Sequence, residues 1–480
     1  MIRLRKFSIT RKFAVTLALT LSISLTAAST QAFAASAEQV QEVRELLEQY
    51  HLSKPDDTLL SAGEMDQMID ALHDPYTQYF DADKWKAFES ALDPKFVGIG
   101  IIIKQGKDGV LVDSIVPSSP AEAAGVLPDD MITVADGESL KGKTVDQVRQ
   151  LLLGKEGTNV QLELIRAGNS VTLTIERKEV PQPVVMAKLL TPGVGYLALS
   201  GFTLNAGSEV KRKLEQLEAQ GLSSLVLDLR DNGGGYVDAA QAIASLFVDK
   251  GVLAHMIDGD GQDSPIELTG TKRNYPVVIL VNGNSASASE LLSGALQDYG
   301  VAKLVGTKTY GKGVVQSLIQ VKSGGVLKVT VQEYLTPTGR KVDKNGLVPD
   351  MFAKGATEQL VDAYRLAGGN DVELTLERGV ATMNGLSMAE PNAAILSQKK
   401  WYIDTRLAAA LVGANVTYDA KAHVIKLMNG ATQLSLKTND ARMIVKDGRS
   451  NVDADLVAKT FAGFAYTGSG EKLKLTAKMN

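Results

Sequence analysis

Short apolar runs and amphipathic stretches alternate through the middle of the chain, which predicts strands and helices in turn. Residues 194–198 and 224–229 are largely apolar, a pattern typical of buried strands. Between them, residues 206–220 space their apolar side chains at helical intervals, and a strand–helix–strand unit favours parallel pairing. A second strand and helix are predicted at residues 277–281 and 290–299, so we expect a mixed α/β core.

The rest of the chain carries other patterns and indicates separate domains. Residues 35–94 are helical in pattern, and residues 95–180 combine alternating, strand-like runs with two short helices. The α/β core is expected to span residues 181–366. After a predicted linker at Gly368-Gly369-Asn370-Asp371, two weakly similar strand–helix–strand–strand units account for residues 372–480.

The N-terminal residues 1–34 have the pattern of a signal peptide. Five basic residues precede an apolar stretch at residues 13–25, and Ala32-Phe33-Ala34 fits a cleavage site. We therefore expect a mature protein outside the cytoplasm, secreted or associated with the cell envelope. Retention of this stretch as an uncleaved membrane anchor is the alternative that the sequence leaves open.

Composition excludes several kinds of chemistry. The chain of 480 residues has no cysteine and four histidines, so a thiol nucleophile, a disulfide framework and a zinc–thiolate site are ruled out. No His-Glu-x-x-His pair is present, and we expect no metal or cofactor. Residues 306–312 match most of the phosphate-loop motif of nucleotide-binding proteins. Residue 313 is glycine where that motif requires Ser or Thr to bind magnesium, so nucleotide binding is not expected. Without the five basic residues of the N-terminal stretch, 46 of the 51 basic residues remain against 55 acidic ones, and this net charge of about −9 argues against general nucleic-acid or anionic-membrane binding.

A strand-to-helix turn at residues 282–290 carries three serines, and Ser287 falls where the helix begins. Unpaired amides at a helix N-terminus can stabilise an oxyanion formed by attack of such a serine. The same residues also fit a capping box, in which Ser287 caps the helix and Glu290 reaches back. On spacing alone, capping is the more ordinary interpretation.

Lys312 opens a predicted strand in which Lys312, Val314 and Gln316 share one face. A lysine activates a serine only when it is neutral, and its ordinary pKa is about 10.4. We therefore expect Lys312 to be buried without a carboxylate partner. A Ser–His–Asp triad through His255 is less favoured, because no Gly-x-Ser-x-Gly motif surrounds Ser287.

Three motifs resemble those of the carboxy-terminal processing (tail-specific) serine proteases: Ser-Ala-Ser-Ala-Ser-Glu ending at Glu290, Gln-Asp-Tyr-Gly around Asp298, and Gly-Lys-Gly-x-Val-Gln ending at Gln316. The resemblance implies that Ser287 is the nucleophile, Lys312 the base and Gln316 its orienting partner. Asp298 also matches a motif position, and its implied role is structural support.

A fourth motif, Asp-Leu-Arg-Asp-Asn-Gly-Gly-Gly over residues 228–235, is similar to the loop that supplies oxyanion amides in that family. The resemblance implies a hole formed by the amide of Gly234, or of its neighbour Gly233, together with that of Ala288. By itself, a triple-glycine loop at a strand end indicates only a tight turn.

Residues 95–180 resemble a PDZ domain, beginning at Phe96-Val-Gly-Ile-Gly-Ile101. The resemblance implies that Val97, Gly98, Ile99 and Gly100 hold the C-terminal carboxylate of a peptide that adds a strand to the domain. The glycines alone would indicate only a turn. Related proteases often carry arginine where this chain has Leu153 before Gly154, so a contact made by that arginine is absent here.

Two further segments have weaker resemblances. His73-Asp-Pro-Tyr-Thr-Gln-Tyr79 is similar to a stretch that precedes the PDZ domain in the same proteases, and we interpret it as a helix-ending turn with two packed tyrosines. Residues 372–480 resemble the small stalk-like domain named after the copper amine oxidase N-terminus. We infer no copper from it, and binding to the wall or a partner and a passive spacer both remain open.

Together these features predict an exported α/β multidomain serine endopeptidase. Its core is expected to be crotonase-like, and its PDZ domain to capture protein or peptide substrates by an exposed C-terminus. A non-catalytic PDZ adaptor and an esterase with the same Ser–Lys pair are the rival hypotheses. The sequence leaves a homo-oligomer and an association with the cell envelope open.

Overall fold

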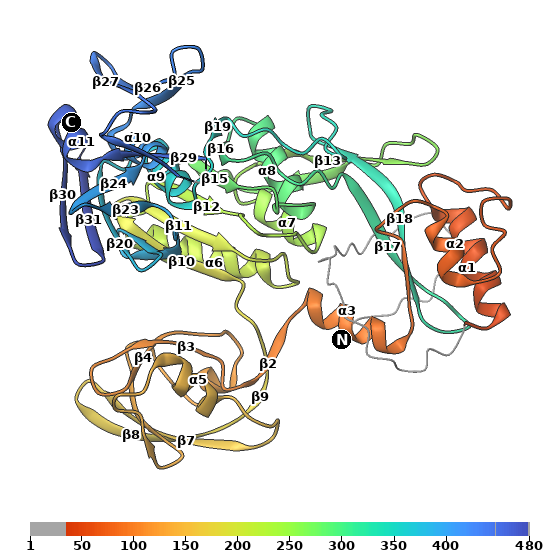
Figure 1. Cartoon of the computed structure of the whole chain (residues 1–480). Helices are drawn as coiled ribbons and strands as arrows, with labels where there is room; N and C mark the ends of the chain where they lie inside the picture. Colours follow the sequence, from red (N-terminus) through yellow and green to blue (C-terminus); the bar gives the residue numbers. More distant parts are fainter. Residues whose placement is uncertain (1–34, 447, 479–480) are drawn as a thin grey trace. The chain divides into compact units, whose positions relative to one another are not determined.

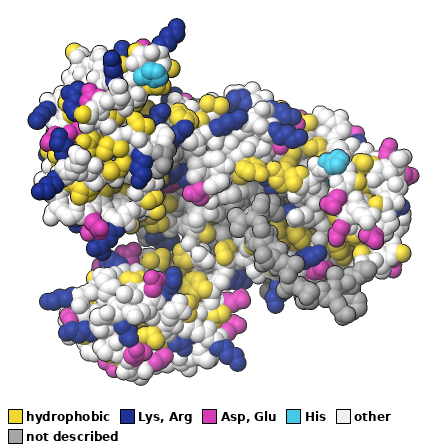
Figure 2. Space-filling view, viewed as in Figure 1, with side chains coloured by type: hydrophobic (Ala, Val, Ile, Leu, Met, Phe, Trp, Pro, Cys, Tyr) yellow, Lys and Arg dark blue, Asp and Glu magenta, His cyan; other side chains and the backbone are white. Residues whose placement is uncertain are grey.

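The computed structural model describes residues 35–446 and 448–478 (Figure 1). The predicted signal peptide, residues 1–34, lies outside the described residues. The described residues divide into two compact units, one formed by those up to position 81 together with those from position 184 onward, and the other by residues 82–183. Among the described residues, no helix has the length and apolar character needed to cross a membrane. Figure 2 shows side chains of both charges spread over one face, in keeping with the small net charge of −4.

The core of the first unit is a six-stranded sheet with the order β10-β11-β12-β15-β16-β19. Parallel pairing runs from β11 to β19, whereas β10 is antiparallel to β11. The predicted strands and their parallel pairing are therefore confirmed. The strands are β10 (Val185–Thr191), β11 (Val194–Leu199), β12 (Ser224–Asp228), β15 (Val277–Val281), β16 (Ala302–Gly306) and β19 (Met351–Phe352).

Alternating side chains of this sheet enter two different cores. On one face, Leu227 and Ile279 pack with α6 (Ala206–Ala219), α7 (Val237–Ala244) and α8 (Ala288–Asp298). On the other face, Val226, Val278 and Leu280 pack with α9 and with residues beyond position 371; α9 spans Ala356–Leu366. The sheet is therefore covered on both faces, as parallel sheets usually are.

A second sheet lies in the same unit and carries the predicted catalytic lysine at one strand end. Its order is β1-β18-β13-β14, and β17 also pairs with β18. The N-terminal helices α1 (Ala37–Tyr50) and α2 (Met65–Asp70) form a small core with Leu327 and Val329 of β18. The strands are β1 (Gln78–Phe80), β13 (Lys250–Asp258), β14 (Ile266–Thr269), β17 (Val314–Gln320) and β18 (Val326–Leu335).

The second unit contains the region predicted to be a PDZ domain, preceded by α3 (Ala82–Leu92). Its sheet has the order β3-β4-β5-β7-β8, with β6 (Glu138–Ser139) beside β5, and a separate pair joins β2 (Lys95–Gly98) to β9 (Lys178–Pro181). Two helices, α4 (Pro120–Ala123) and α5 (Val145–Leu152), complete it. The strands are β3 (Ile101–Gln105), β4 (Val110–Ile115), β5 (Met131–Ala135), β7 (Asn159–Arg166) and β8 (Asn169–Glu176).

Each C-terminal unit predicted from the sequence has a strand, a helix and two strands in the structure. The first is β24 (Lys400–Asp404), α10 (Thr405–Val412), β25 (Asn415–Asp419) and β26 (Val424–Asn429). The second is β29 (Arg449–Asp453), α11 (Ala454–Thr460), β30 (Phe464–Ser469) and β31 (Lys472–Lys478). The other strands are β20 (Asp371–Glu377), β21 (Val380–Met383), β22 (Leu386–Ala389), β23 (Ala394–Ser397), β27 (Thr432–Lys437) and β28 (Met443–Lys446).

The stretch predicted to be a linker before these units is a packed turn instead. Gly369 N donates to Tyr364 O at 2.9 Å, which continues directly from α9. A Cβ on Gly369 would lie 2.2 Å from Tyr364 Cζ, so the ring rests on the glycine backbone. Glycine is needed here for close approach and not for freedom of movement.

Candidate active site

Ser287 stands at the turn between β15 and α8 in a strained conformation. Its φ is +54° and its ψ −108°, a region that residues with a Cβ rarely adopt. The side chain is 1% exposed, and its Oγ has no hydrogen-bond partner among the described residues. Only the glutamate half of the predicted capping box forms, because Ser287 N donates to Glu290 Oε2 at 2.9 Å while Ser287 Oγ accepts nothing.

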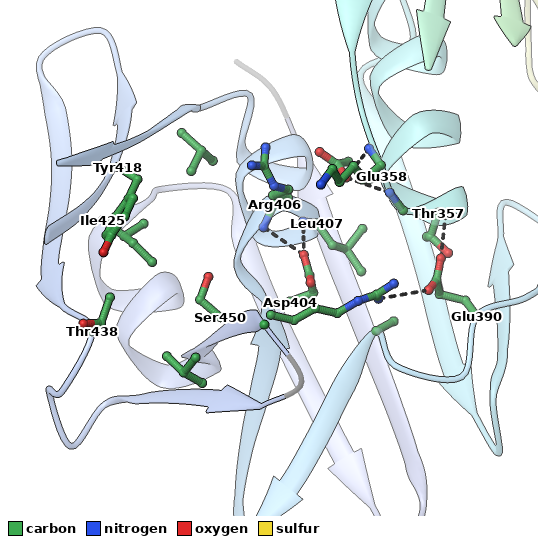
Figure 3. A pocket seen from close by; sticks show the side chains of 17 residues that line it. Thr357, Glu358, Glu390, Asp404, Arg406, Leu407, Tyr418, Ile425, Thr438 and Ser450 are labelled. Atoms are coloured by element: carbon green, nitrogen blue, oxygen red, sulfur yellow. Dashed lines mark hydrogen bonds and ion pairs between the residues drawn. The ribbon is translucent and has the colours of Figure 1, made fainter. Parts of the chain in front are cut away.

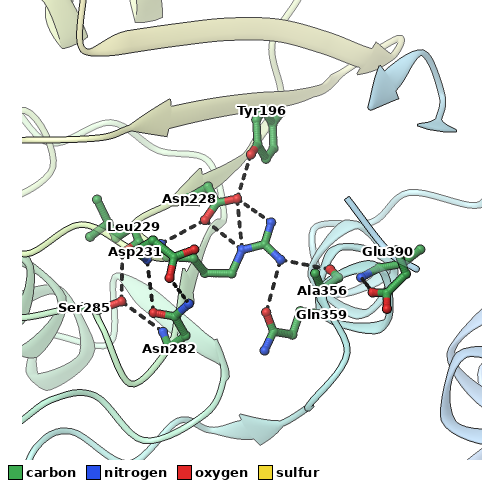
Figure 4. Close-up of polar contacts among 11 residues, drawn as sticks. Tyr196, Asp228, Leu229, Asp231, Asn282, Ser285, Ala356, Gln359 and Glu390 are labelled. Carbon is green, nitrogen blue, oxygen red and sulfur yellow. Dashed lines mark hydrogen bonds and ion pairs between the residues drawn. The ribbon is translucent and has the colours of Figure 1, made fainter. Parts of the chain in front are cut away.

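The serines on either side of Ser287 have structural roles. Ser285 Oγ donates to Leu229 O at 2.8 Å, and Ser289 Oγ donates to Asn232 O at 2.8 Å. Both bonds fasten the turn to the loop that follows β12 (Figure 4 draws the first). Of the three serines, Ser287 is therefore the one whose hydroxyl remains for chemistry.

Glu290 joins the serine turn to the lysine loop. Its buried carboxylate accepts hydrogen bonds from Ser287 N, Thr309 Oγ1, Gly311 N and Lys312 N at 2.5 to 2.9 Å. Burial raises the pKa of Glu290 despite these donors. The sequence singled out Glu290 only as a cap, and missed its bonds to the lysine loop because they join residues about twenty positions apart.

A tyrosine hydroxyl holds the same two backbones from another side. Tyr334, which is fully buried on β18, donates to Lys312 O at 2.9 Å and lies 3.4 Å from Ser287 O. The structure therefore brings the backbones of Ser287 and Lys312 together. Their side chains are not hydrogen-bonded to each other, since neither Ser287 Oγ nor Lys312 Nζ has a hydrogen-bond partner among the residues that the structure describes.

Lys312 lies in a dry environment without an acidic partner in hydrogen-bonding contact. Its side chain is 2% exposed, and Nζ lies 4.4 Å from the centroid of the Tyr76 ring. Burial, and then the positive charge of Lys328, lower the pKa of Lys312 well below its ordinary value. The negative charges of Asp74 and Glu290 act to raise this pKa but do not outweigh the two lowering causes.

Gln316 lies on β17, four residues after Lys312. It is 1% exposed, and its Nε2 donates to Thr330 Oγ1 on β18 at 3.3 Å. Because Nε2 is held, Gln316 Oε1 has a fixed direction, and this oxygen has no partner among the described residues. An oriented acceptor of this kind is suited to binding an amine.

The segment from His73 to Tyr79, interpreted from the sequence as a structural turn, also forms a wall of this site. Besides the contact of Tyr76 with Lys312, Thr77 Oγ1 accepts from Thr330 N at 3.0 Å and donates to Asp74 Oδ2 at 2.6 Å. Burial acts to raise the pKa of Asp74, but hydrogen bonds from His51, Thr330, Thr77 and Tyr76 N hold it well below the usual range. The family-like motif was the signal that could have indicated a role in the site.

In the glycine loop after β12, the amide of Gly234 is already hydrogen-bonded. Gly234 N donates to Asn232 Oδ1 at 2.8 Å, so this amide is not available to a substrate in this conformation. Asn232 is completely buried, and its Nδ2 donates to Leu199 O at 2.7 Å. A Cβ on Gly235 would lie 2.3 Å from Phe202 O, so the loop packs closely against the chain beyond β11.

The other predicted residues lie outside this cluster. Asp298 accepts from Thr338 N at 2.9 Å and Thr338 Oγ1 at 2.7 Å and pairs with Arg340, which fixes a turn at the far end of α8. His255 pairs with Asp263 at 2.6 Å and not with Ser287. Among the described residues, no group of three or more His, Asp or Glu side chains could hold a metal ion.

In the second unit, the predicted peptide loop is tightly fixed. Ile99 is 1% exposed in the core, and a Cβ on Gly100 would lie 2.3 Å from Ser119 Cβ. The carbonyls of Val97, Ile99 and Gly100 accept from backbone amides elsewhere in the unit. Within the part of the chain that the structure describes, the neighbouring strand β3 pairs with β4 alone, so its other edge, near α5, is open to an added strand.

Comparisons with known proteins agree with these two units. Residues 193–352 match the family model described as "Peptidase family S41", and residues 97–176 match "PDZ domain". A "Probable CtpA-like serine protease" of Staphylococcus aureus (strain MSSA476) is 35% identical over 321 residues, covering 66% of this chain and 64% of the relative. A "Probable CtpA-like serine protease" of Staphylococcus haemolyticus (strain JCSC1435) is 37% identical over 295 residues, covering 61% of this chain and 59% of the relative.

The chain thus spans slightly less than two thirds of the length of these relatives. Among solved structures, the "photosystem II D1 C-terminal processing protease" is 29% identical with a TM-score of 0.42. That match covers 67% of this chain and 94% of the solved chain.

Proposed function

We propose that this chain, which matches the model of peptidase family S41 over residues 193–352 and that of a PDZ domain over residues 97–176, is a serine endopeptidase of that family with Ser287 as nucleophile and Lys312 as base. One observation carries the proposal: two buried groups without a hydrogen-bond partner among the described residues, Ser287 Oγ and Lys312 Nζ, belong to residues whose backbone amides both donate to the Glu290 carboxylate. Ser287 also has a strained backbone at a helix N-terminus. Burial favours the neutral amine that a base must be.

Catalysis begins when the Lys312 side chain swings from the Tyr76 ring toward Ser287, because the two groups are not hydrogen-bonded here. Neutral Lys312 takes the Ser287 Oγ proton as the oxygen attacks the peptide carbonyl carbon. The tetrahedral intermediate collapses as the Lys312 ammonium gives that proton to the leaving amine. Water then attacks the acyl-enzyme with Lys312 again as base, and the proton returns to Ser287 Oγ as the acid leaves.

The oxyanion is stabilised by the amide of Ala288, in the first turn of α8, and by the amide of Gly233. The engagement of Gly234 N by Asn232 Oδ1 favours Gly233 over Gly234 for this role. Gln316 Oε1 orients the amine by accepting one of its hydrogens, since Gln316 Nε2 is already held by Thr330. Asp298 supports the fold from outside the reacting groups.

The substrates in this proposal are polypeptides with a free C-terminus. Such a tail would add a strand to the open edge of β3 and place its carboxylate at the loop from Val97 to Gly100. Residues 1–34 would direct export, so that cleavage takes place outside the cytoplasmic membrane.

The test is cleavage of an unstructured peptide with a free C-terminus by the full-length chain. Wild type should cleave it, whereas Ser287→Ala and Lys312→Ala should lose at least about a thousandfold in kcat/KM. An otherwise identical peptide with an amidated C-terminus should be cleaved more slowly if the PDZ domain captures the carboxylate. Equal activity of wild type and Ser287→Ala would refute the proposed nucleophile.

A further inference from the structure

The C-terminal region, residues 371–478, shares one hydrophobic core with the catalytic sheet. Its buried side chains form a continuous cluster with the sheet face opposite α8 and with α9 (Figure 1). Removing the region would therefore expose apolar side chains of α9 and of this sheet face to water. The shared core includes Val226, Val278, Leu280 and Val305 of the sheet, Leu360, Val361 and Tyr364 of α9, and Leu374, Leu407, Leu411 and Leu475 of the C-terminal region.

Hydrogen bonds cross the same junction. Tyr364 OH on α9 donates to Asp371 O at 2.9 Å and lies 3.0 Å from Thr191 Oγ1 on β10. Arg365 Nη2 donates to Leu411 O at 2.7 Å. A spacer that only separates a core from a distant surface needs neither these bonds nor a shared core.

A cavity of about 610 Å³ lies where the first turn of α9 meets the C-terminal region (Figure 3). Three carboxylates line it, and each already accepts from backbone amides at the start of a helix. Glu358 accepts from Lys354 N and Gly355 N, Asp404 from Arg406 N and Leu407 N, and Glu390 from Thr357 N at 3.0 Å. Glu390 differs from the others because it lies between β22 and β23 and caps α9 from outside the protease core.

The first turn of α9 also accepts hydrogen bonds from Arg230, at the start of the glycine loop after β12 (Figure 4). Arg230, two residues after β12, donates through Nη1 to Ala356 O at 2.9 Å and to Gln359 Oε1 at 3.1 Å. The same guanidinium pairs with Asp228 at 2.5 Å, and Asp228 accepts from Tyr196 OH at 2.6 Å. Arg230 therefore fixes the start of the glycine loop to α9.

We propose that residues 371–478 brace the active site, with Glu390 and Arg230 as positioning residues that hold the glycine loop through the first turn of α9. The proposal rests on the proposed peptidase function. Without Glu390, the Thr357 amide loses its partner and the first turn of α9 loosens. The acceptors of Arg230 then move, and with them the loop that carries Gly233. A displacement of about 1 Å in a catalytic group can cost about a hundredfold in rate.

The test uses full-length Glu390→Ala, Arg230→Lys and their double variant in the peptide cleavage assay. Glu390→Ala should lower kcat about 10-fold and leave KM within about twofold, because an oxyanion amide acts in the transition state. Glu390→Gln, which keeps one acceptor oxygen for Thr357 N, should restore most of that loss. Glu377→Ala is the matched control, since this C-terminal glutamate is exposed and pairs only with Lys472 among the described residues.

The double variant distinguishes an effect transmitted through α9 from two independent losses of activity. If both residues act through α9, the loss in the double variant should be clearly smaller than the product of the two single losses. Should Glu390→Ala not fold, Glu390→Asp, which retains the charge but shortens its reach, takes its place in the same cycle. Wild-type kcat for the Glu390 variant, or strictly multiplicative losses, would overturn the brace. An active Ser287→Ala would instead refute the proposed function.

Discussion

Replacing Lys312 with methionine should abolish cleavage and at the same time stabilise the protein. The amine is 2% exposed and has no hydrogen-bond partner among the described residues, so folding strips it of water without compensation. An unsatisfied buried polar group costs about 1–3 kcal/mol, and methionine fills a similar linear volume without that cost. We expect the free energy of unfolding to rise by at least about 1 kcal/mol at neutral pH.

The stability that Lys312→Met gains over the wild type should decrease as the pH rises. Because the folded-state pKa of Lys312 lies well below its ordinary value of 10.5, the unfolded chain binds a proton that the folded chain lacks between these two values. The unfolding free energy of the wild type therefore rises with pH in this window, by about 1.4 kcal/mol for each pKa unit of depression. The advantage of Lys312→Met should be largest below the folded-state pKa and smallest near pH 10.5.

Chemical denaturation of both proteins at pH 6, 8 and 10 measures this difference, and peptide cleavage measures the loss of activity. Lys303→Met is the matched control, because Lys303 is 62% exposed and its removal should change stability by less than about 0.5 kcal/mol. A Lys312→Met variant that is less stable than wild type at every pH, or that still cleaves peptide, would refute the assignment of a dry, neutral lysine.

Three further outcomes follow from the same cluster. Ser287→Gly should be inactive yet more stable by about 1 kcal/mol in denaturant melts, since glycine relieves the positive φ; lower stability would argue against strain at this position. Glu290→Gln should lower both the unfolding free energy, by about 1–3 kcal/mol, and kcat, because an amide nitrogen would face donors that now meet a carboxylate oxygen. Lys328→Met should move the acid limb of the kcat/KM profile to higher pH and Lys328→Arg should not, because the positive neighbour lowers the pKa of Lys312; identical profiles would exclude this electrostatic role.

Local patterns in the sequence were sufficient to predict the strands of the core sheet, and they identified the serine and lysine motifs whose backbones the structure brings together. The apolar runs that became β11, β12 and β15 are buried on both faces, so their composition alone marks them as strands. The placement of Tyr76 against Lys312 could not be predicted in this way, because it depends on β1 pairing with β18. Pairing between strands so far apart in sequence leaves no periodic signal in either one.

The loop proposed to stabilise the oxyanion shows a second limit of sequence reasoning. A motif assigns a set of residues but not the direction of each backbone amide, and here two adjacent glycines differ in whether Asn232 Oδ1 engages the amide. The distinction depends on Asn232 being fixed by Leu199 O, which lies on a neighbouring strand. The sequence could therefore narrow the proposed oxyanion hole to Gly233 or Gly234, and the preference for Gly233 rests on the hydrogen bond made by Gly234 N in the structure.

The junction at Gly368 and Gly369 was misinterpreted for a physical reason. Two consecutive glycines followed by Asn and Asp have the composition of a flexible linker, and composition does not distinguish freedom of movement from close approach. In the structure, the Tyr364 ring covers Gly369, and the same tyrosine hydroxyl binds Asp371 O. A glycine that is required by an aromatic ring indicates a fixed junction, and a fixed junction is what a brace acting through α9 requires.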